Sequence, residues 1–246
     1  MSTIIEGRNA VLEALRSGAP VRRLLVAEGT KPNSAIEEIY SLAQAADIPV
    51  QRVARKKLDA ASERGAHQGV MIETVPFVYT PLAEVIERSG ANKRSLVIVL
   101  DHVTDPGNLG AVIRSAEVAG ADAVVIPKDR SAGVGPVAFK SSAGAVVHIP
   151  IVQTTNLVRA LNVLKEEGYW VGGAAADADS MLWDAPMDGR IVLVMGAEGP
   201  GLSRLVRENC DFTVALPVAG QVDSLNVAQA TSVLAFEWVR RGRTEG

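Results

Sequence analysis

Polar side chains that a hydrophobic core does not need gather in three glycine-rich stretches of this sequence. The first, DPGNLGAVIR, contains Asn108 and Arg114; the second, VMGAEGPGLSRL, contains Glu198; the third, LPVAGQVDSLNVAQA, contains Ser224 and Asn226. Amide, hydroxyl, carboxylate and guanidinium groups can bind a phosphate or orient a hydroxyl group, and glycines let a ligand approach the backbone closely. These five residues are therefore the candidates for binding and catalysis.

Three of the candidates also have a purely structural explanation. Asn108 stands where the N-cap of a helix is expected, and Arg114 could form an i,i+3 ion pair with Glu117. Glu198 at the start of a short helix would gain about 0.3–1 kcal/mol from the helix dipole. Residue type alone leaves both explanations open.

The elements that must position these residues follow from the hydrophobic pattern. Amphipathic and apolar segments alternate over residues 1–75, which predicts a small α/β domain, and the polar, proline-containing segment 76–94 predicts a linker. Residues 95–246 contain nearly all-apolar strands, which favour a parallel sheet covered on both faces. We expect helices over 7–18, 33–47, 56–65, 133–145, 154–168, 201–210 and 224–241, and strands over 22–29, 48–53, 69–75, 95–100, 146–152, 169–176, 190–196 and 212–217.

The last helix, SLNVAQATSVLAFEWVRR, is apolar or small around most of its circumference. A surface helix of this length has a polar face, so the pattern favours a subunit interface over an internal core helix. We expect Ser224 to cap this helix. Asn226 would lie in its first turn, where a buried amide needs hydrogen-bond partners.

The stretch LDHVTDPGNLGAVIRSAEVAGADAVVIP predicts a strand, a glycine-rich turn, a helix and a strand, as in many nucleotide-binding folds. Its glycines form G-x-x-G and not G-x-G-x-x-G, and no acidic residue ends the second strand, AVVIPKDR. The sequence also contains no G-K-[ST] phosphate loop. These departures weaken the case for a dinucleotide-dependent oxidoreductase.

Composition limits the class of protein. The chain has 246 residues, 48% of them hydrophobic, a net charge of −3, one cysteine and three histidines. No segment has the length of a membrane span or the pattern of a secretory signal, so we expect a cytoplasmic protein. Cys210 without a partner excludes an internal disulfide, and the scattered histidines give no metal-ligand spacing, so we expect no metal cofactor.

The densest group of positive charges is in VQRVARKK, which contains Arg52, Arg55, Lys56 and Lys57. Such a cluster is typical both of a solvated helix start and of a surface that contacts phosphates. We consider it a candidate RNA-binding surface.

Taken together, DHVTDPGNLGAVIRSAE, LVMGAEGPGLS and LPVAGQVDSLNVAQATSV resemble, in order and spacing, the three motifs of the SpoU (TrmH-like) RNA 2′-O-ribose methyltransferases of the SPOUT superfamily. The segment VVIPKDRSAGVGPVAFKSSAGA and a first domain that opens EGRNAVLEAL and closes AHQGVMIE are similar to the branch that methylates a guanosine ribose in 23S ribosomal RNA. The resemblance covers almost the full chain. One departure is the small-residue segment GVGPVAFKSSAGA, where that branch often has polar residues, which bears on the RNA target more than on the methyl donor.

The resemblance implies an α/β trefoil-knot catalytic domain over residues 95–246, preceded over residues 1–75 by an RNA-binding domain similar to small α/β ribosomal proteins. It also implies a homodimer formed through the knot domain, a 23S rRNA substrate and S-adenosylmethionine as methyl donor. Catalytic positions carry over as Asn108, Arg114, Glu198, Ser224 and Asn226, and cofactor contacts as Gly196, Leu216, Val218 and Leu225.

Two roles are conceivable for Arg114. A neutral arginine at pH 7 costs about 7.5 kcal/mol, so we prefer a role in binding the target phosphate to a role as general base. Two further functions stay open beside 23S rRNA methylation: a tRNA or antibiotic-target rRNA methyltransferase of the same family, and a non-catalytic RNA-binding protein on this scaffold.

Overall fold

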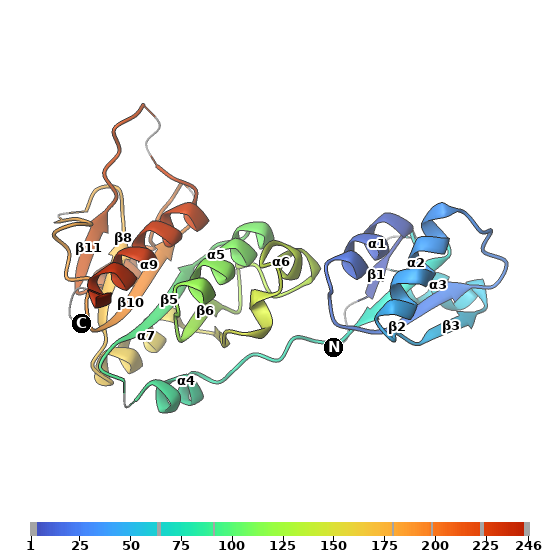
Figure 1. Ribbon diagram of the computed structural model, residues 1–246, viewed down its shortest axis with the longest axis horizontal. Helices are drawn as coiled ribbons and strands as arrows, with labels where there is room; N and C mark the ends of the chain where they lie inside the picture. The colour runs from blue at the N-terminus through green and yellow to red at the C-terminus, as the bar shows by residue number, and fades with distance from the viewer. Residues whose placement is uncertain are drawn as a thin grey trace. The chain divides into compact units, whose positions relative to one another are not determined.

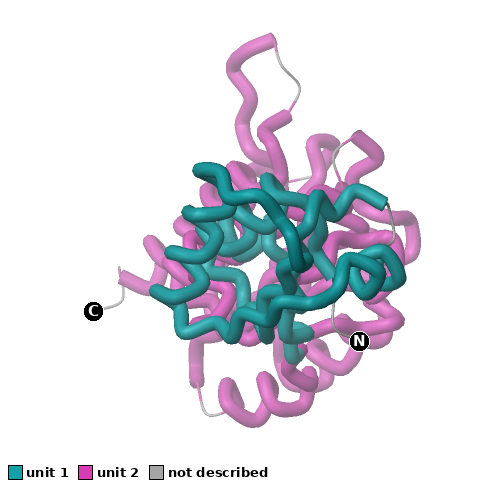
Figure 2. The backbone as a smooth tube through the Cα atoms, turned by 90° about the vertical axis from the view of Figure 1, so that its right-hand side faces the viewer, with its two compact units in different colours: residues 1–78, 135–140 teal, residues 79–134, 141–246 magenta. Residues whose placement is uncertain are grey.

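The structure, a computed structural model, describes residues 4–62, 65–90, 92–178, 180–197, 199–221 and 224–243. The chain forms two compact units (Figure 2). Unit 1 comprises residues 1–78 and 135–140, and unit 2 comprises residues 79–134 and 141–246.

Unit 1 is a four-stranded sheet in the order β1-β4-β2-β3, in which β2 runs parallel to β3 and antiparallel to β4. The small α/β fold expected for this part of the chain is confirmed, but β1 is a strand that the sequence pattern did not predict. The elements are β1 Ile4–Glu6, α1 Arg8–Arg16, β2 Val21–Ala27, α2 Ser34–Ala45, β3 Val50–Val53, α3 Arg55–Ala61 and β4 Val70–Thr74.

Successive residues of β2 pack on opposite faces of this sheet. Leu24 and Val26 belong to the hydrophobic core beneath α1 and α2, whereas Leu25 and Ala27 pack with Leu58 of α3. This alternation follows from the two-residue period of a strand. The sheet of unit 1 is therefore covered on both faces.

Unit 2 has a seven-stranded sheet in the order β7-β6-β5-β10-β8-β11-β9, and every pairing in it is parallel. The parallel sheet expected from the apolar strands is thus confirmed; the trefoil knot stays a prediction. Figure 1 shows α5 and α9 together on one face. The strands are β5 Ser95–Asp101, β6 Ala123–Pro127, β7 Ile151–Thr154, β8 Trp170–Ala174, β9 Ser180–Met181, β10 Arg190–Gly196 and β11 Phe212–Ala215; the helices are α4 Leu82–Ser89, α5 Pro106–Val118, α6 Pro136–Ser141, η1 Ala145–Val147, α7 Leu157–Glu166, α8 Arg204–Glu208 and α9 Val227–Arg243.

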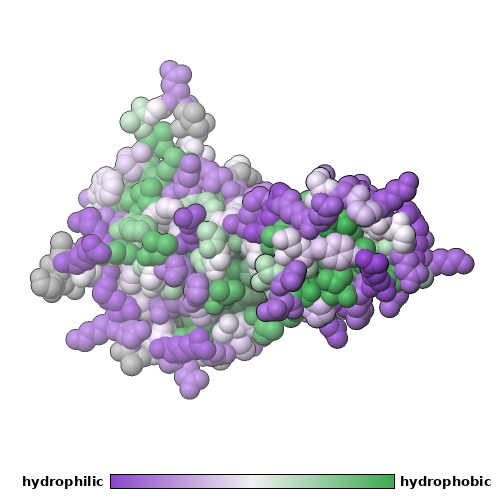
Figure 3. Space-filling model, turned by 45° about the vertical axis from the view of Figure 1, so that its right-hand side comes forward, coloured by the Kyte–Doolittle hydropathy of each residue, from purple (hydrophilic) through white to green (hydrophobic). Residues whose placement is uncertain are grey.

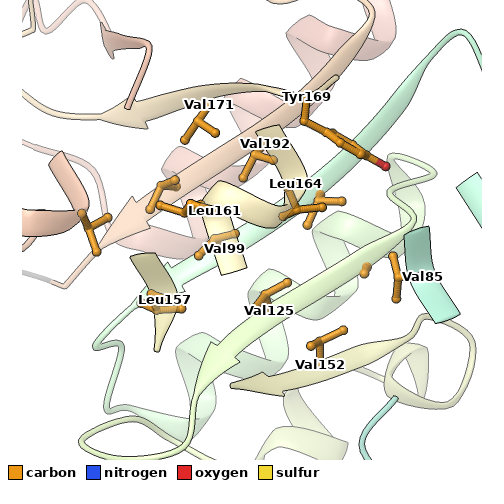
Figure 4. Packing of buried hydrophobic residues seen from close by; sticks show 14 residues of the cluster. Val85, Val99, Val125, Val152, Leu157, Leu161, Leu164, Tyr169, Val171 and Val192 are labelled. Atoms are coloured by element: carbon orange, nitrogen blue, oxygen red, sulfur yellow. The ribbon is translucent and has the colours of Figure 1, made fainter. Parts of the chain in front are cut away.

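The opposite face of this sheet is covered by α4, α7 and α8. Leu161 and Leu164 of α7 pack on valines of β5, β6 and β10 in a continuous core (Figure 4). The hydroxyl group of Tyr169 lies 2.8 Å from that of Ser89 and 2.6 Å from that of Ser95, so a buried polar contact joins α4 to the sheet. The segment 76–94, which we expected to be a linker, therefore contributes a helix with buried residues to unit 2.

Several element predictions are wrong in their bounds. The helix expected over 133–145 spans only Pro136–Ser141. The strand expected over 146–152 begins at Ile151, because Val146 lies in the short 3-10 helix η1. The last helix begins at Val227 and not at Ser224. Among the described residues, no helix is long and apolar enough to cross a membrane.

Candidate functional site

The three polar stretches follow β5, β10 and β11, three strands of one parallel sheet. Strands β5 and β10 are neighbours, with Asp101 opposite Gly196 at their ends. Since the strands are parallel, the loops that follow them leave from the same edge. Ligands of open α/β sheets bind outside this carboxyl edge, so the sheet places all three stretches where a binding site is expected.

The loop after β10 folds tightly back on its own strand. Ala197 and Gly201 exchange backbone hydrogen bonds of 3.2 and 2.9 Å, and Gly201 has a φ of 68°. A Cβ atom on Gly196 would lie 2.3 Å from the carbonyl carbon of Gly201. Gly196 is therefore required by the close approach of the loop backbone.

A buried carboxylate connects the loops after β5 and β10. Asp101 is 1% exposed, and its Oδ2 accepts a 2.6 Å hydrogen bond from the backbone N–H of Ser203 at the start of α8. Its Oδ1 lies 2.5 Å from Nδ1 of His102. This link was not predicted from the sequence, although an aspartate that ends the apolar run SLVIVLD was a signal for it.

The N-cap of α5 is Asp105 and not Asn108. The Asp105 side chain accepts a 2.7 Å hydrogen bond from the backbone N–H of Asn108, which lies in the first turn behind Pro106. The capping explanation for Asn108 is therefore wrong. Its amide is left to interact outside its own helix.

Asn226 caps α9, which corrects the prediction that Ser224 does so. Oδ1 of Asn226 accepts a 2.9 Å hydrogen bond from the N–H of Ala228, and the Asn226 carbonyl accepts a 2.9 Å bond from Ala230. Its Nδ2 donates a 3.0 Å hydrogen bond to Oδ1 of Asn108. The partner that the sequence required for this amide is thus the candidate residue of the first loop.

A second contact keeps the two helices in register. Ser115 of α5 and Ser232 of α9 have their hydroxyl oxygens 2.7 Å apart. Asn108 and Ser115 are seven residues apart, which is almost two helical turns, so they lie on the same side of α5. This side of the helix faces α9.

Arg114 lies on a different side of α5. It is exposed, and at 100° per residue it lies about a third of a turn from the line that joins Asn108 and Ser115. In the described part of the chain, Arg114 has no ion pair, so the i,i+3 pair with Glu117 is not formed. Among the described residues, no hydrogen bond or ion pair joins Arg114 to Asn108 or Asn226.

The remaining candidates of the three loops are exposed or undescribed. Glu198 lies outside the described residues. Ser224 is exposed. The loop from β11 to α9 stands out from the body of unit 2 in Figures 1 and 2.

Apolar side chains are open to solvent in this projecting loop. Val218 is 50% exposed and Leu225 is 47% exposed, while Leu216 at the base of the loop is half-buried. Hydrophobic surface lines the base of the projection in Figure 3. An exposed group of this kind offers an apolar contact to a ligand or a partner.

The cluster of positive charges in unit 1 is at the surface. Arg52 is in β3, and Arg55, Lys56 and Lys57 form the first turn of α3; all four side chains are exposed. This position is compatible with both interpretations of the cluster, a solvated helix start and a phosphate-binding surface.

Cys210 is a packed thiol. Burial raises the pKa of the Cys210 thiol to about 11. A Cβ atom on Gly173 of β8 would lie 2.8 Å from its Sγ, so the thiol is packed tightly against the sheet. A thiol with this pKa stays protonated near pH 7 and is a poor nucleophile.

Two family models match the chain. The SpoU rRNA Methylase family matches residues 95–236, and the family described as RNA 2'-O ribose methyltransferase substrate binding matches residues 4–80. The first match contains all three polar loops.

Named relatives and solved structures are similar to the chain over most of its length. The 23S rRNA (guanosine-2'-O-)-methyltransferase RlmB of Pseudomonas putida is 44% identical over 224 residues, which are 90% of this chain and 89% of that protein. The AdoMet-bound rRNA methyltransferase of Sinorhizobium meliloti has a TM-score of 0.62 at 26% identity and covers 98% of this chain and 87% of its own. The SpoU methyltransferase AviRb of Streptomyces viridochromogenes has the same fold, with a TM-score of 0.67 at 24% identity over 99% of this chain and 91% of its own.

Proposed function

The chain belongs to the SpoU rRNA methylase family, and we infer from this that it transfers a methyl group from S-adenosylmethionine to a ribose 2′-hydroxyl of RNA. We propose a guanosine of 23S rRNA as the target, because the relative named above is a 23S rRNA guanosine-2′-O-methyltransferase that aligns over 90% of this chain. The observation that carries the proposal is the hydrogen bond between Asn226 and Asn108. It joins the loops after β5 and β11 at the edge where the glycine loop after β10 also leaves the sheet.

The residues at this edge fit S-adenosylmethionine. Its adenine needs apolar contacts, which the exposed side chains of Val218 and Leu225 and the half-buried Leu216 offer. The glycine loop from Gly196 to Gly201 would present backbone groups to the polar part of the molecule. When bound, the donor supplies an electrophilic methyl group on a sulfonium.

The chain itself must align the ribose hydroxyl with that methyl group. Asn108 and Asn226 hold each other's amides through their 3.0 Å bond, so their orientation is fixed before RNA binds. Positioning of this kind can remove several kcal/mol from a reaction barrier. We assign the two amides to orienting the ribose, and we retain Ser224 and Glu198 as candidate catalytic residues.

Arg114 is assigned to the phosphate of the target nucleotide. Its guanidinium is exposed, as a phosphate ligand must be before RNA binds, and it can bind two phosphate oxygens as a fork. In this role Arg114 remains charged throughout, and the hydroxyl proton leaves to water.

We further propose that unit 2 forms a homodimer through α5 and α9. Val233 and Phe236 of α9 are 40% and 47% exposed, and Val118 of α5 is 61% exposed. Arg114 and Val118 are four residues apart and lie on one face of α5. The dimer would cover this apolar surface and place Arg114 at its border. Because the proposed substrate is ribosomal RNA, we expect the protein in the cytoplasm.

The proposed function is tested by mapping ribose methylation in ribosomal RNA and tRNA from cells with and without the gene. We expect one 23S rRNA guanosine to lose its methyl group. If only a tRNA site changes, the substrate is wrong and the reaction stands; if no site changes, the enzyme assignment is contradicted.

The role of Arg114 is tested by the pH dependence of single-turnover methylation in the wild type and in Arg114→Lys. A positioning role predicts the same pH profile with a lower maximum rate. A large shift of the Lys variant's profile to acidic pH would instead make Arg114 the general base.

A further inference from the structure

A hollow in unit 1 is lined by residues of β2, β3 and α2, at the point where the two strands end. It is open to solvent and has a cavity volume of about 110 Å³. Strands β2 and β3 are parallel, with Val26 opposite Arg52, so the hollow is at the carboxyl end of both strands. This is the edge of an α/β sheet at which ligands bind.

The wall of the hollow is held in place by contacts within the chain. The hydroxyl group of Thr30 donates a 2.7 Å hydrogen bond to the carbonyl of Ala27. Gly69 has a φ of 86°, and a Cβ atom there would lie 2.6 Å from Oγ1 of Thr30. The backbone N–H of Gly69 in turn donates a 3.0 Å hydrogen bond to Nδ1 of the buried His67. The hollow therefore exists before any ligand binds.

The lining of the hollow combines three kinds of chemistry. Val26 and Ile36 form an apolar floor, Tyr40 adds an aromatic ring, Glu37 adds a carboxylate and Arg52 adds a cation at the exposed rim. The carboxylate argues against a simple anion site, and the cation argues against a purely apolar ligand. A flat, hydrogen-bonding aromatic group attached to a phosphate satisfies the apolar floor, the ring, the carboxylate and the cation together.

We propose that this hollow binds one unpaired guanine nucleotide of the substrate RNA. The base stacks on Tyr40, its N1–H and N2–H groups donate to the carboxylate of Glu37, and its phosphate contacts Arg52. Unpaired bases that stack on aromatic side chains and expose their Watson–Crick edge are the usual targets of sequence-specific RNA recognition. Among the bases, guanine has two adjacent donors on that edge, which match the two oxygens of a carboxylate. The inference rests on the proposed function, since it takes RNA as the ligand.

The first test measures binding of the full-length protein to the pentaribonucleotide UUGUU and to UUIUU, whose inosine lacks the N2 amino group. We expect the wild type to bind the guanosine oligonucleotide about ten- to a hundred-fold more tightly, which is the effect of one hydrogen bond to a charged acceptor. Glu37→Gln should bind both oligonucleotides equally. The matched control is Glu38→Gln, because Glu38 is the next residue of α2 and pairs with Arg16 at 2.6 Å, outside the hollow; it should keep the preference.

The second test removes the stacking and phosphate contacts. Tyr40→Leu keeps an apolar side chain in the core and should weaken binding of UUGUU about ten-fold, as expected for a lost stacking partner. Arg52→Gln should lower affinity less and reduce the dependence of log Kd on log salt by about one. Unchanged S-adenosylmethionine binding and thermal unfolding in each variant would show that the fold is intact.

Retention of the guanosine preference in Glu37→Gln, or unchanged affinity in Tyr40→Leu, would overturn the inference, because the oligonucleotide would then bind elsewhere on the protein. The readout is RNA binding without methyl transfer. Failure to methylate rRNA would therefore count against the proposed function alone, whereas normal methylation with the wild-type guanosine preference in Glu37→Gln would count against the hollow alone.

Discussion

Replacement of Asn226 separates two contacts that one side chain makes at the same time. Its Oδ1 caps α9 through Ala228, and its Nδ2 donates to Asn108. Loss of an N-cap costs about 1 kcal/mol, and loss of a partly buried hydrogen bond costs about 1 kcal/mol more. The serine side chain of Asn226→Ser still caps the helix but is too short to reach Asn108, so this variant should lower the free energy of unfolding by about 1 kcal/mol. Asn226→Ala loses both contacts and should lower it by about 2 kcal/mol.

Thermal and urea unfolding of the full chain measure these costs. We expect melting temperatures about 2–4 °C lower for the serine variant and about 4–8 °C lower for the alanine variant. Both variants should also lower the single-turnover methylation rate about 10- to 100-fold, because the orientation of the ribose is lost in each.

Asn156 supplies a matched control, because it caps α7 by accepting a 3.0 Å hydrogen bond from the N–H of Arg159. Asn156→Ser should be as stable as the wild type and fully active. If Asn226→Ser is also as stable as the wild type, the bond to Asn108 does not stabilise the protein. If it methylates RNA at the wild-type rate, the proposed role of the two amides is wrong.

Three further predictions follow from contacts elsewhere in unit 2. Gly196→Ala should lower the free energy of unfolding by about 3 kcal/mol and abolish stabilisation by S-adenosylmethionine in a melting assay. Gly220→Ala should do neither, because a Cβ atom on Gly220 would meet no atom within 4 Å. Glu237 is 4% exposed, and its hydrogen bonds to Arg240 and, to a smaller extent, Arg241 lower its carboxyl pKa to about 2. Glu237→Gln should therefore lower the free energy of unfolding in urea at pH 7 by about 1–3 kcal/mol. Because the pKa is lowered in the folded state, this cost should be constant above about pH 5 and shrink as the pH falls from about 4.5 towards 2; a cost that does not change with pH would show that it comes from packing. Cys210 should react with a maleimide at pH 7 more than ten-fold more slowly than free cysteine, and Cys210→Ala should methylate RNA normally; fast labelling would contradict the burial of its thiol.

The class of the fold could be predicted from the sequence because the strands of unit 2 have a strong pattern. All seven residues of β5 are buried, as their apolar run indicates. The order of the strands could not be predicted. Strand β10 lies between β5 and β8, although it is about ninety residues from β5 in sequence and as apolar as its neighbours. Strand β9 has only two residues, Ser180 and Met181, which is too short for any periodic pattern.

The sequence indicated the positions of the three loops better than the contacts of single residues. The capping explanation for Asn108 was avoidable, because Pro106 is favoured at the first helical position and so indicates Asp105 as the cap. For α9, serine and asparagine are equally good caps, so local preference does not distinguish Ser224 from Asn226. The contact with Asn108, 118 residues away, is the tertiary interaction that Asn226 gains.

Arg114 was grouped with Asn108, which lies on another side of α5 in the folded chain. Sequence spacing located it on the correct helix, and the helical period already indicates that positions 108 and 114 point in different directions. What spacing could not show is the neighbouring exposed apolar surface, since that depends on how α9 packs beside α5.

The hydrogen bond from the Ser203 backbone to the buried Asp101 has a thermodynamic consequence. It holds the loop after β10, which we assign to the methyl donor, against β5, the strand that leads to Asn108. The accepting carboxylate belongs to Asp101, which is 1% exposed. We therefore expect any donor-induced movement of that loop to act on the first loop. Coupling between two binding equilibria is reciprocal, so a donor that tightens RNA binding by some factor must itself bind the RNA complex more tightly by the same factor. Asp101→Asn, which keeps an acceptor of nearly the same shape, would show how much of that factor depends on the charge.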